Sequence, residues 1–268
     1  MLKDITLGQY FPGNTVAHRL DPRTKILLVV LYIVALFCAK HVVSYGLMAL
    51  TLAACIRISR VRLKTMVKGL KPVVFIVVFT AVLNLFFTPG ERNLVALGPI
   101  HISDTGLENA IFMVLRILML IMGTFLMTYT TSPISLTDGL ERLLSGLKRF
   151  RVPVHELAMM MSIALRFIPT LIEETDKIMS AQKARGADFE SGNLMEKAKA
   201  LIPILVPLFI SAFRRADELA TAMECRCYHG GEGRTKLHVL KYEARDYIAL
   251  ALGVVVLAAV LVLRKFGL

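Results

Sequence analysis

Five long apolar runs constrain the fold of this chain more than any other feature of its sequence. They cover residues 26–39, 42–56, 72–87, 107–131 and 248–263, and the whole 268-residue chain is 56% hydrophobic. A helix needs about 20 apolar residues to cross a bilayer, and shorter runs can do so when flanking lysines and arginines extend to the interface. The runs therefore predict an all-α integral membrane protein with about five spans. They argue against a soluble enzyme, a disordered chain or a nucleic-acid-binding domain.

The connecting loops predict the orientation in the membrane. Residues 57–71 hold six basic and no acidic side chains, which places this loop in the cytoplasm under the positive-inside rule. Residues 88–106 carry little net charge and are placed outside. The amino terminus is then cytoplasmic, and the last span leaves Arg264 and Lys265 outside, which the rule mildly disfavours. The first two runs could instead form one re-entrant hairpin, but two short spans are the preferred interpretation.

The composition changes between residues 132 and 246. This segment is rich in both basic and acidic side chains, so most of its length cannot lie in lipid. We predict three parts: a membrane region at residues 1–131 with four spans, cytoplasmic coupling helices at 132–246, and a final span within 247–268. The middle part is typical of an amphipathic helix over residues 135–150, N-capped by Ser135, followed by two long helices.

The two long helices are predicted over residues 154–185 and 195–226, and they share a plan. Each has a proline-containing apolar half, then a charged half, and each ends at an arginine, Arg185 or Arg226. Gly186 suits the left-handed position that ends a helix. A guanidinium at such an end can pair bidentately with a carboxylate of a partner, although simple C-capping by arginine is the alternative.

Other candidate features give weaker indications of a functional site. The glycines within residues 230–234 lack the lysine and serine of a phosphate-binding loop. Cys225, Cys227 and His229 supply only three ligands for a soft metal, so small residues at a helix end are the preferred interpretation. Arg116 interrupts the fourth run; it could contact a partner subunit or pair with Asn84, and a helix-to-helix structural role is preferred. We predict no catalytic residue, no metal site and no cofactor.

At two places the chain resembles a known family. Residues 5–10, which read ITLGQY, and residues 18–25, which read HRLDPRTK just before the first run, are similar to the T component of energy-coupling factor (ECF) transporters, a family that includes the cobalt-transport permease type. The family signature is a pair of Ala-Arg-Gly motifs at the ends of two long coupling helices. The first is present as Ala184, Arg185 and Gly186; the second keeps Arg226 between two cysteines.

The resemblance implies a non-catalytic subunit of an ATP-driven importer in the cell membrane of a prokaryote. Such a subunit joins two cytosolic ATPase subunits to a small membrane protein that binds the substrate. Carried over to this chain, the ATPase-binding residues are Ala184, Arg185, Gly186, Cys225, Arg226 and Cys227. The surface for the substrate-binding subunit is assigned to Met159, Met160, Met161, Leu165, Leu205 and Phe209. The expected cargo is a vitamin, with cobalt or nickel ions as the alternative.

Two other function classes were weighed against the coupling subunit. An independent secondary transporter should carry acidic or proton-relay residues inside its spans, and none lies in the interior of the five runs. A membrane-embedded enzyme should show a catalytic constellation, and we identify none.

Overall fold

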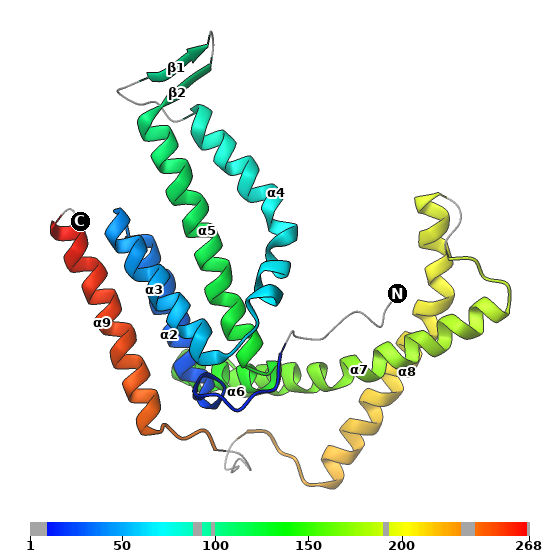
Figure 1. Ribbon diagram of the computed structural model, residues 1–268. Helices are drawn as coiled ribbons and strands as arrows, with labels where there is room; N and C mark the ends of the chain where they lie inside the picture. Colours follow the sequence, from blue (N-terminus) through cyan, green and yellow to red (C-terminus); the bar gives the residue numbers. More distant parts are fainter. Residues whose placement is uncertain (1–9, 88–92, 98–99, 190–192, 232–238, 267–268) are drawn as a thin grey trace. The chain divides into compact units, whose positions relative to one another are not determined.

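The computed structural model describes residues 10–87, 93–97, 100–189, 193–231 and 239–266 (Figure 1). Helices dominate these residues, which confirms the predicted all-α membrane architecture. The elements are α1 (Val16–Arg19), α2 (Pro22–Cys38), α3 (Val42–Ser59), α4 (Leu63–Phe87), β1 (Asn93–Leu97), β2 (Ile100–Ser103), α5 (Asp104–Thr130), α6 (Pro133–Leu144), the 3-10 helix η2 (Ser145–Phe150), α7 (Val154–Ala184), α8 (Leu194–Cys225) and α9 (Ala244–Phe266).

The chain divides into two compact units. The first, here called the bundle unit, comprises residues 8–139 and 240–268 and holds α1 to α5 and α9. The second, the α7–α8 unit, comprises residues 140–239 together with the first seven residues, which lie outside the described part. The predicted boundaries at residues 132 and 246 were set by charge alone, and the side of the membrane on which each part lies stays a prediction.

In the bundle unit, α5 is the central helix. It packs against α2, α3 and α4, and α9 packs against α2 and α3 (Figure 1). Two glycines allow helices to approach closely: a Cβ on Gly123 would lie 2.5 Å from the Tyr32 ring, and one on Gly253 would lie 2.6 Å from Leu28. Small residues at helix contacts are typical of membrane bundles, where close packing replaces the hydrophobic effect as the source of association.

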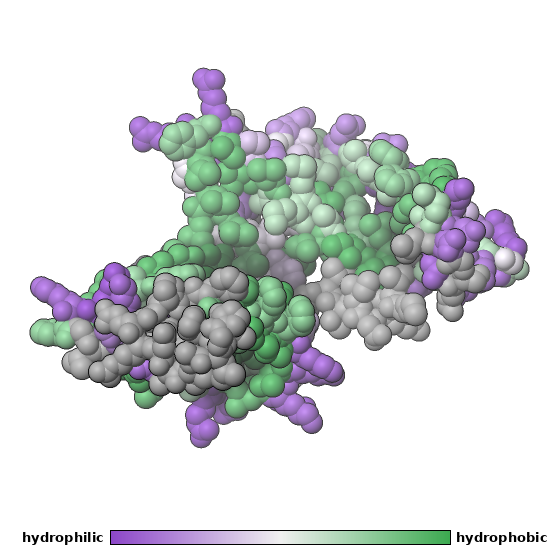
Figure 2. All heavy atoms as spheres, turned by 90° about the horizontal axis from the view of Figure 1, so that it is seen from above, coloured by the Kyte–Doolittle hydropathy of each residue, from purple (hydrophilic) through white to green (hydrophobic). Residues whose placement is uncertain are grey.

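Five helices have the length and apolarity to cross a membrane, namely α3, α4, α5, α7 and α9. Four of them coincide with predicted spans, and the fifth is α7, which was predicted as a coupling helix; the predicted first span forms the shorter helix α2. At 17 residues α2 is only about 26 Å long. The apolar first half of α7 explains its place among the five, because its charged residues cluster after Thr170. Hydrophobic residues cover much of the coloured surface in Figure 2, as expected for helices that face lipid.

The connection between α4 and α5, treated from the sequence only as a loop, contains an antiparallel pair of strands. Strands β1 and β2 pair with Leu97 opposite Ile100, and the register shifts between Asn93 and Val95 (Figure 1). Aliphatic residues recur along both short strands, which favours extended backbone.

Helix α6 corrects the predicted N-cap and the predicted helix length. It begins at Pro133, and the Ser132 hydroxyl accepts a hydrogen bond from the Ser135 backbone N–H at 3.2 Å. The N-cap is therefore Ser132 rather than Ser135, because proline suits the first helical position and the residue before it becomes the cap. The α-helix ends at Leu144 instead of continuing to residue 150. The next two residues, Ser145 and Gly146, have low helix propensity and begin η2.

Arg116 has the structural role that was preferred, but its partner was predicted wrongly. Its guanidinium donates to the Tyr45 hydroxyl at 3.0 Å and to the Ala39 carbonyl at 3.2 Å, so it joins α5 to α3 and to the end of α2. The carbonyls at a helix C-terminus lack partners within the helix and carry partial negative charge, which a cation neutralises. Asn84 instead donates to the Thr80 carbonyl at 2.9 Å.

Candidate functional site

The first candidate motif lies at the carboxyl end of α7. Arg185 is the C-cap with φ −87°, and Gly186 follows with φ +87°. The Gly186 N–H donates to the Lys183 carbonyl at 3.0 Å, and the Ala187 N–H donates to the Gln182 carbonyl at 3.0 Å. This pair of bonds defines a Schellman motif, in which the left-handed residue is usually glycine. The predicted helix end at residues 184–186 is confirmed.

The second motif closes α8 with the same geometry although its sequence differs. Arg226 is the C-cap with φ −93°, and Cys227 takes the left-handed position with φ +55°. The Cys227 N–H donates to the Glu224 carbonyl at 2.9 Å, and the Tyr228 N–H donates to the Met223 carbonyl at 3.1 Å. A residue with a Cβ pays about 1–2 kcal/mol in this conformation. The end of α8 therefore has the same Schellman geometry as the end of α7, with local backbone strain at Cys227.

The equivalence of the two helices extends inward from their ends. The Ser180 hydroxyl of α7 donates to the Asp176 carbonyl at 2.7 Å, and the Thr221 hydroxyl of α8 donates to the Asp217 carbonyl at 2.9 Å. Ser180 and Thr221 are the same number of residues apart as Arg185 and Arg226, and so are Asp176 and Asp217. Two helices of different sequence thus end in matching charged turns.

Both arginine side chains are exposed, as are the four residues that flank them. Within the described residues, neither Arg185 nor Arg226 has an ion pair or a side-chain hydrogen bond. A simple C-capping role would direct the guanidinium back to the carbonyls of its own helix. The two cations are instead available to a carboxylate outside this chain.

A polar contact fixes α7 against α8. Glu174 of α7 accepts a short hydrogen bond from the Ser211 hydroxyl and pairs with Arg215 of α8 at 3.1 Å. Proline at position 207 has no N–H, so the Pro203 carbonyl one turn earlier loses its partner within α8. The Gln182 side chain lies 3.4 Å from that carbonyl and donates to it. Sequence reasoning identified neither link, because both join residues on different helices.

The residues assigned to the substrate-subunit surface are largely exposed. Met160, Met161, Leu205 and Phe209 expose 54%, 49%, 46% and 61% of their surface, and Leu165 is half-buried. Met159 is half-buried, and the hydroxyl of Tyr228, just beyond the second arginine motif, donates to its sulfur at 3.1 Å.

On α8 the exposed apolar surface extends further than predicted. It comprises Leu201, Ile202, Leu205, Val206, Phe209, Ile210 and Phe213. Phe213 was missed, although its ring stacks on Phe209 with centroids 6.4 Å apart. Its spacing of four from Phe209 is the signal that could have found it.

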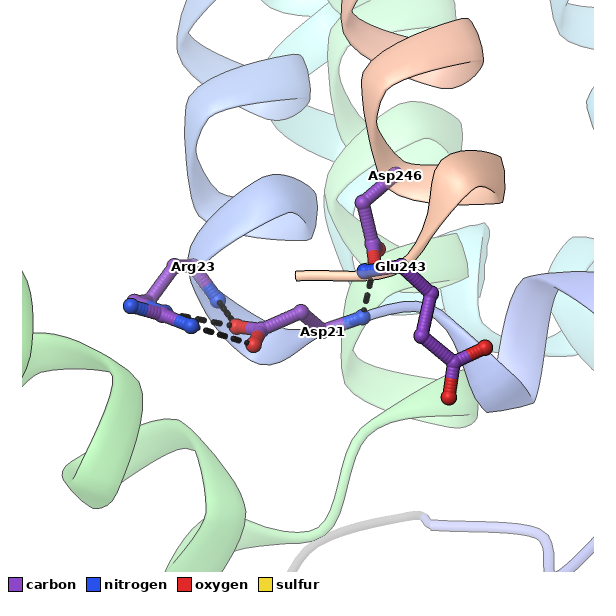
Figure 3. Close-up of polar contacts among 4 residues, drawn as sticks. All are labelled: Asp21, Arg23, Glu243 and Asp246. Carbon is purple, nitrogen blue, oxygen red and sulfur yellow. Dashed lines mark hydrogen bonds and ion pairs between the residues drawn. The ribbon is translucent and has the colours of Figure 1, made fainter. Parts of the chain in front are cut away.

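The HRLDPRTK segment forms a buried junction in the bundle unit (Figure 3). Asp21 caps α2, accepting from the Arg23 backbone N–H at 2.9 Å and from the Arg23 guanidinium at 2.7 and 3.0 Å. The Asp21 backbone N–H donates to Asp246 at 2.8 Å, and the Glu243 backbone N–H donates to the other oxygen of Asp246 at 2.9 Å. Lys25 donates to the Thr130 carbonyl at 2.8 Å. One motif thus ties together the ends of α2, α5 and α9.

The electrostatics of this junction favour its ionised form. Burial raises the pKa of the Asp21 carboxyl, but the hydrogen bonds and charge of Arg23, together with the charge of Lys25, outweigh burial and hold that pKa below its usual value. The Arg23 guanidinium also lies 3.9 Å over the Tyr242 ring. Asp246 was not predicted, and its distance in sequence from Asp21 leaves no local signal.

The sequence comparisons identify the family to which these features belong. Residues 13–237 match the CbiQ family, described as cobalt transport protein. The chain belongs to this family. Curated relatives named energy-coupling factor transporter transmembrane protein EcfT include one from Thermosediminibacter oceani, 56% identical over 92% of this chain and 93% of the relative. Others come from Clostridium kluyveri, at 54% identity over 99% and 98%, and from Bacillus subtilis, at 48% over 97% and 98%.

The described part of this CbiQ-family chain contains no group of three or more His, Cys, Asp or Glu side chains placed to hold a metal ion. Cys225 is the last residue of α8, and Cys227 and His229 lie just beyond its end. The first stretch of the resemblance, residues 5–10, lies outside the described residues except for Tyr10.

Proposed function

We propose that this CbiQ-family chain is the non-catalytic transmembrane coupling subunit of an ATP-driven importer of the ECF type. The observation that carries the proposal is the pair of matched helix ends, each presenting an exposed arginine that has no side-chain partner among the described residues. The names of relatives that cover nearly the whole chain support it. Two equivalent cationic ends fit two equivalent partners, such as a pair of homologous ATPases.

In this mechanism each arginine end inserts into an acidic groove of one ATPase subunit. Arg185 and Arg226 pair with carboxylates there, and the planar guanidinium fixes the angle of each helix end. Closure of the ATPases on ATP then moves the two ends together. The Glu174–Arg215 pair holds α7 and α8 to each other, so the movement passes along both helices.

The moving helices carry the apolar surface on which the substrate-binding subunit is expected to sit. Exposed methionines on α7 and exposed aliphatic and aromatic side chains on α8 provide it. Unbranched thioethers such as Met160 and Met161 adapt to a partner that shifts position. We assign a vitamin as the cargo, with cobalt or nickel ions as the alternative; the family description names cobalt.

The proposal also sets the position in the cell. The bundle unit lies in the cell membrane, and the ends of α7 and α8 lie in the cytoplasm, where the ATPases are. The charge of residues 57–71 supports this orientation through the positive-inside rule.

Charge reversal at both helix ends tests the docking. The variant carrying Arg185→Glu and Arg226→Glu, co-expressed with the ATPase and substrate-binding subunits, should lose co-purification of the ATPases and uptake of cargo. The matched control carries Lys177→Glu and Arg214→Glu, which make the same charge change at exposed positions of α7 and α8. The control should keep both. A stable complex with normal uptake in the first variant would refute the proposal, and so would transport by the wild-type chain reconstituted alone.

A second variant separates the two partner surfaces. Phe209→Glu should weaken retention of the substrate-binding subunit while the ATPases still co-purify, because a charge then replaces an exposed ring at the apolar surface. Loss of the ATPases instead would contradict the assignment of this surface.

A further inference from the structure

A cavity of about 780 Å³ opens at one end of the bundle unit. Its walls come from the segment that precedes and includes α1 and from the turn that joins α3 to α4, and it has two kinds of lining. Polar and cationic groups are supplied by Asn14, Thr15, His18, Ser59, Arg60 and Arg62. Apolar groups are supplied by Phe11, Val16 and Ile58, whose exposed fractions are 47%, 57% and 54%.

The walls of the cavity are fixed by contacts within the bundle unit. The Phe11 N–H donates to the Tyr129 carbonyl at 3.0 Å, and the two rings meet edge to face with centroids 5.4 Å apart. The His18 ring is held between the Thr15 hydroxyl at 2.7 Å and the Phe11 carbonyl at 3.1 Å. The cavity is thus built by the fold rather than left by loose packing.

None of the described residues that line the cavity is acidic. Residues 57–71 carry six cations and no anion, and within the described residues none of the six forms an ion pair. Arg60 ends α3 in the left-handed conformation with φ +54°, where glycine would be free of strain. An uncompensated set of guanidinium groups beside a cavity attracts an anion, and arginine matches the oxygens of a phosphate.

The position of the cavity indicates whether the phosphate belongs to a lipid or is a free ion. Both α3 and α4 have the length and apolarity of membrane spans, so the turn between them lies at the bilayer surface. Exposed Leu63 and Val67 follow directly on α4 and would face acyl chains. A free phosphate ion gains no contact from apolar walls. A phospholipid presents its phosphate together with its glycerol and acyl carbons, so it can contact both kinds of lining.

We propose that this cavity binds the phosphate headgroup of an anionic phospholipid, with Arg60 and Arg62 on the phosphate and Phe11, Val16 and Ile58 against the lipid's apolar part. The lipid holds the α3–α4 turn against the segment before α2. This site is separate from the helix ends of the proposed coupling function and does not depend on it.

Lipid retention by the purified full-length chain tests the site. Native mass spectrometry of the chain in detergent, titrated with phosphatidylglycerol or with phosphatidylcholine, should show preferential retention of phosphatidylglycerol. The variant with Arg60→Gln and Arg62→Gln should retain it roughly tenfold more weakly. The matched control, Lys68→Gln with Lys71→Gln, removes the same charge from α4 outside the cavity and should bind like wild type.

A variant without charge change separates the cavity from the charge of the loop. Val16→Trp fills the cavity from its apolar side and should also lose phosphatidylglycerol. Equal retention by the arginine variant and the lysine control would refute a site and leave only general attraction to an anionic surface. Displacement of the lipid by low millimolar inorganic phosphate would refute the lipid as ligand.

Discussion

Replacing Asp246 tests whether the junction in Figure 3 holds the bundle unit together. Its carboxylate exposes only 1% of its surface and accepts two backbone N–H bonds, at 2.8 Å from Asp21 and 2.9 Å from Glu243. Asp246→Ala removes the acceptor of both N–H groups, and each donor left unsatisfied costs about 1–3 kcal/mol. We therefore expect a loss of about 2–6 kcal/mol in the free energy of unfolding. Asp246→Asn should lose less, because its amide oxygen still accepts one bond.

The measurement is thermal or denaturant unfolding of the purified chain in detergent, followed by far-ultraviolet circular dichroism. Glu243→Ala is the matched control, because the Glu243 side chain is 56% exposed and only pairs with Arg245 at the surface. Such exposed pairs contribute less than about 1 kcal/mol. If Asp246→Ala and Glu243→Ala proved equally stable, the buried carboxylate would not be what ties α9 to α2, and the reasoning would fail.

Three further predictions address the helix ends, the spans and the junction. Gly186→Ala should destabilise its helix end by about 1–2 kcal/mol because alanine is strained at φ +87°, whereas Cys227→Gly should leave its helix end unchanged or stabilise it. Hydrogen exchange at the two helix ends would show the two stability changes with opposite signs. Equal stability changes would contradict the shared Schellman geometry. Arg116→Leu should lower unfolding free energy by about 1–3 kcal/mol, since the Ala39 carbonyl loses its donor; unchanged melting would remove the helix-to-helix role. Asp21→Asn should destabilise at neutral pH, and because the folded-state pKa of Asp21 is depressed, the difference from wild type should shrink as pH falls below about 4; a difference that grew with acid would reverse the assigned sign.

The candidate site shows how far local sequence signals extend. The end of α7 was predictable because Arg185 and Gly186 are adjacent and the left-handed preference of glycine is a local property. The matching end of α8 was predictable in position from its arginine but not in geometry. Cys227 has no local preference for φ +55°, so the backbone hydrogen bonds of the whole turn impose it.

Apolar length, loop charge and helix periodicity by themselves determined that this protein is a helical membrane protein with two long arginine-tipped helices, because these properties act over one or a few turns. Only the tertiary structure decided the partners: Asp246 for Asp21, Tyr45 and Ala39 for Arg116, and the residues that enclose the cavity beside Arg60. Each of these joins positions far apart in the chain. Their pairing is set by which helices pack together, and apolar surfaces of similar helices carry little information about their neighbours.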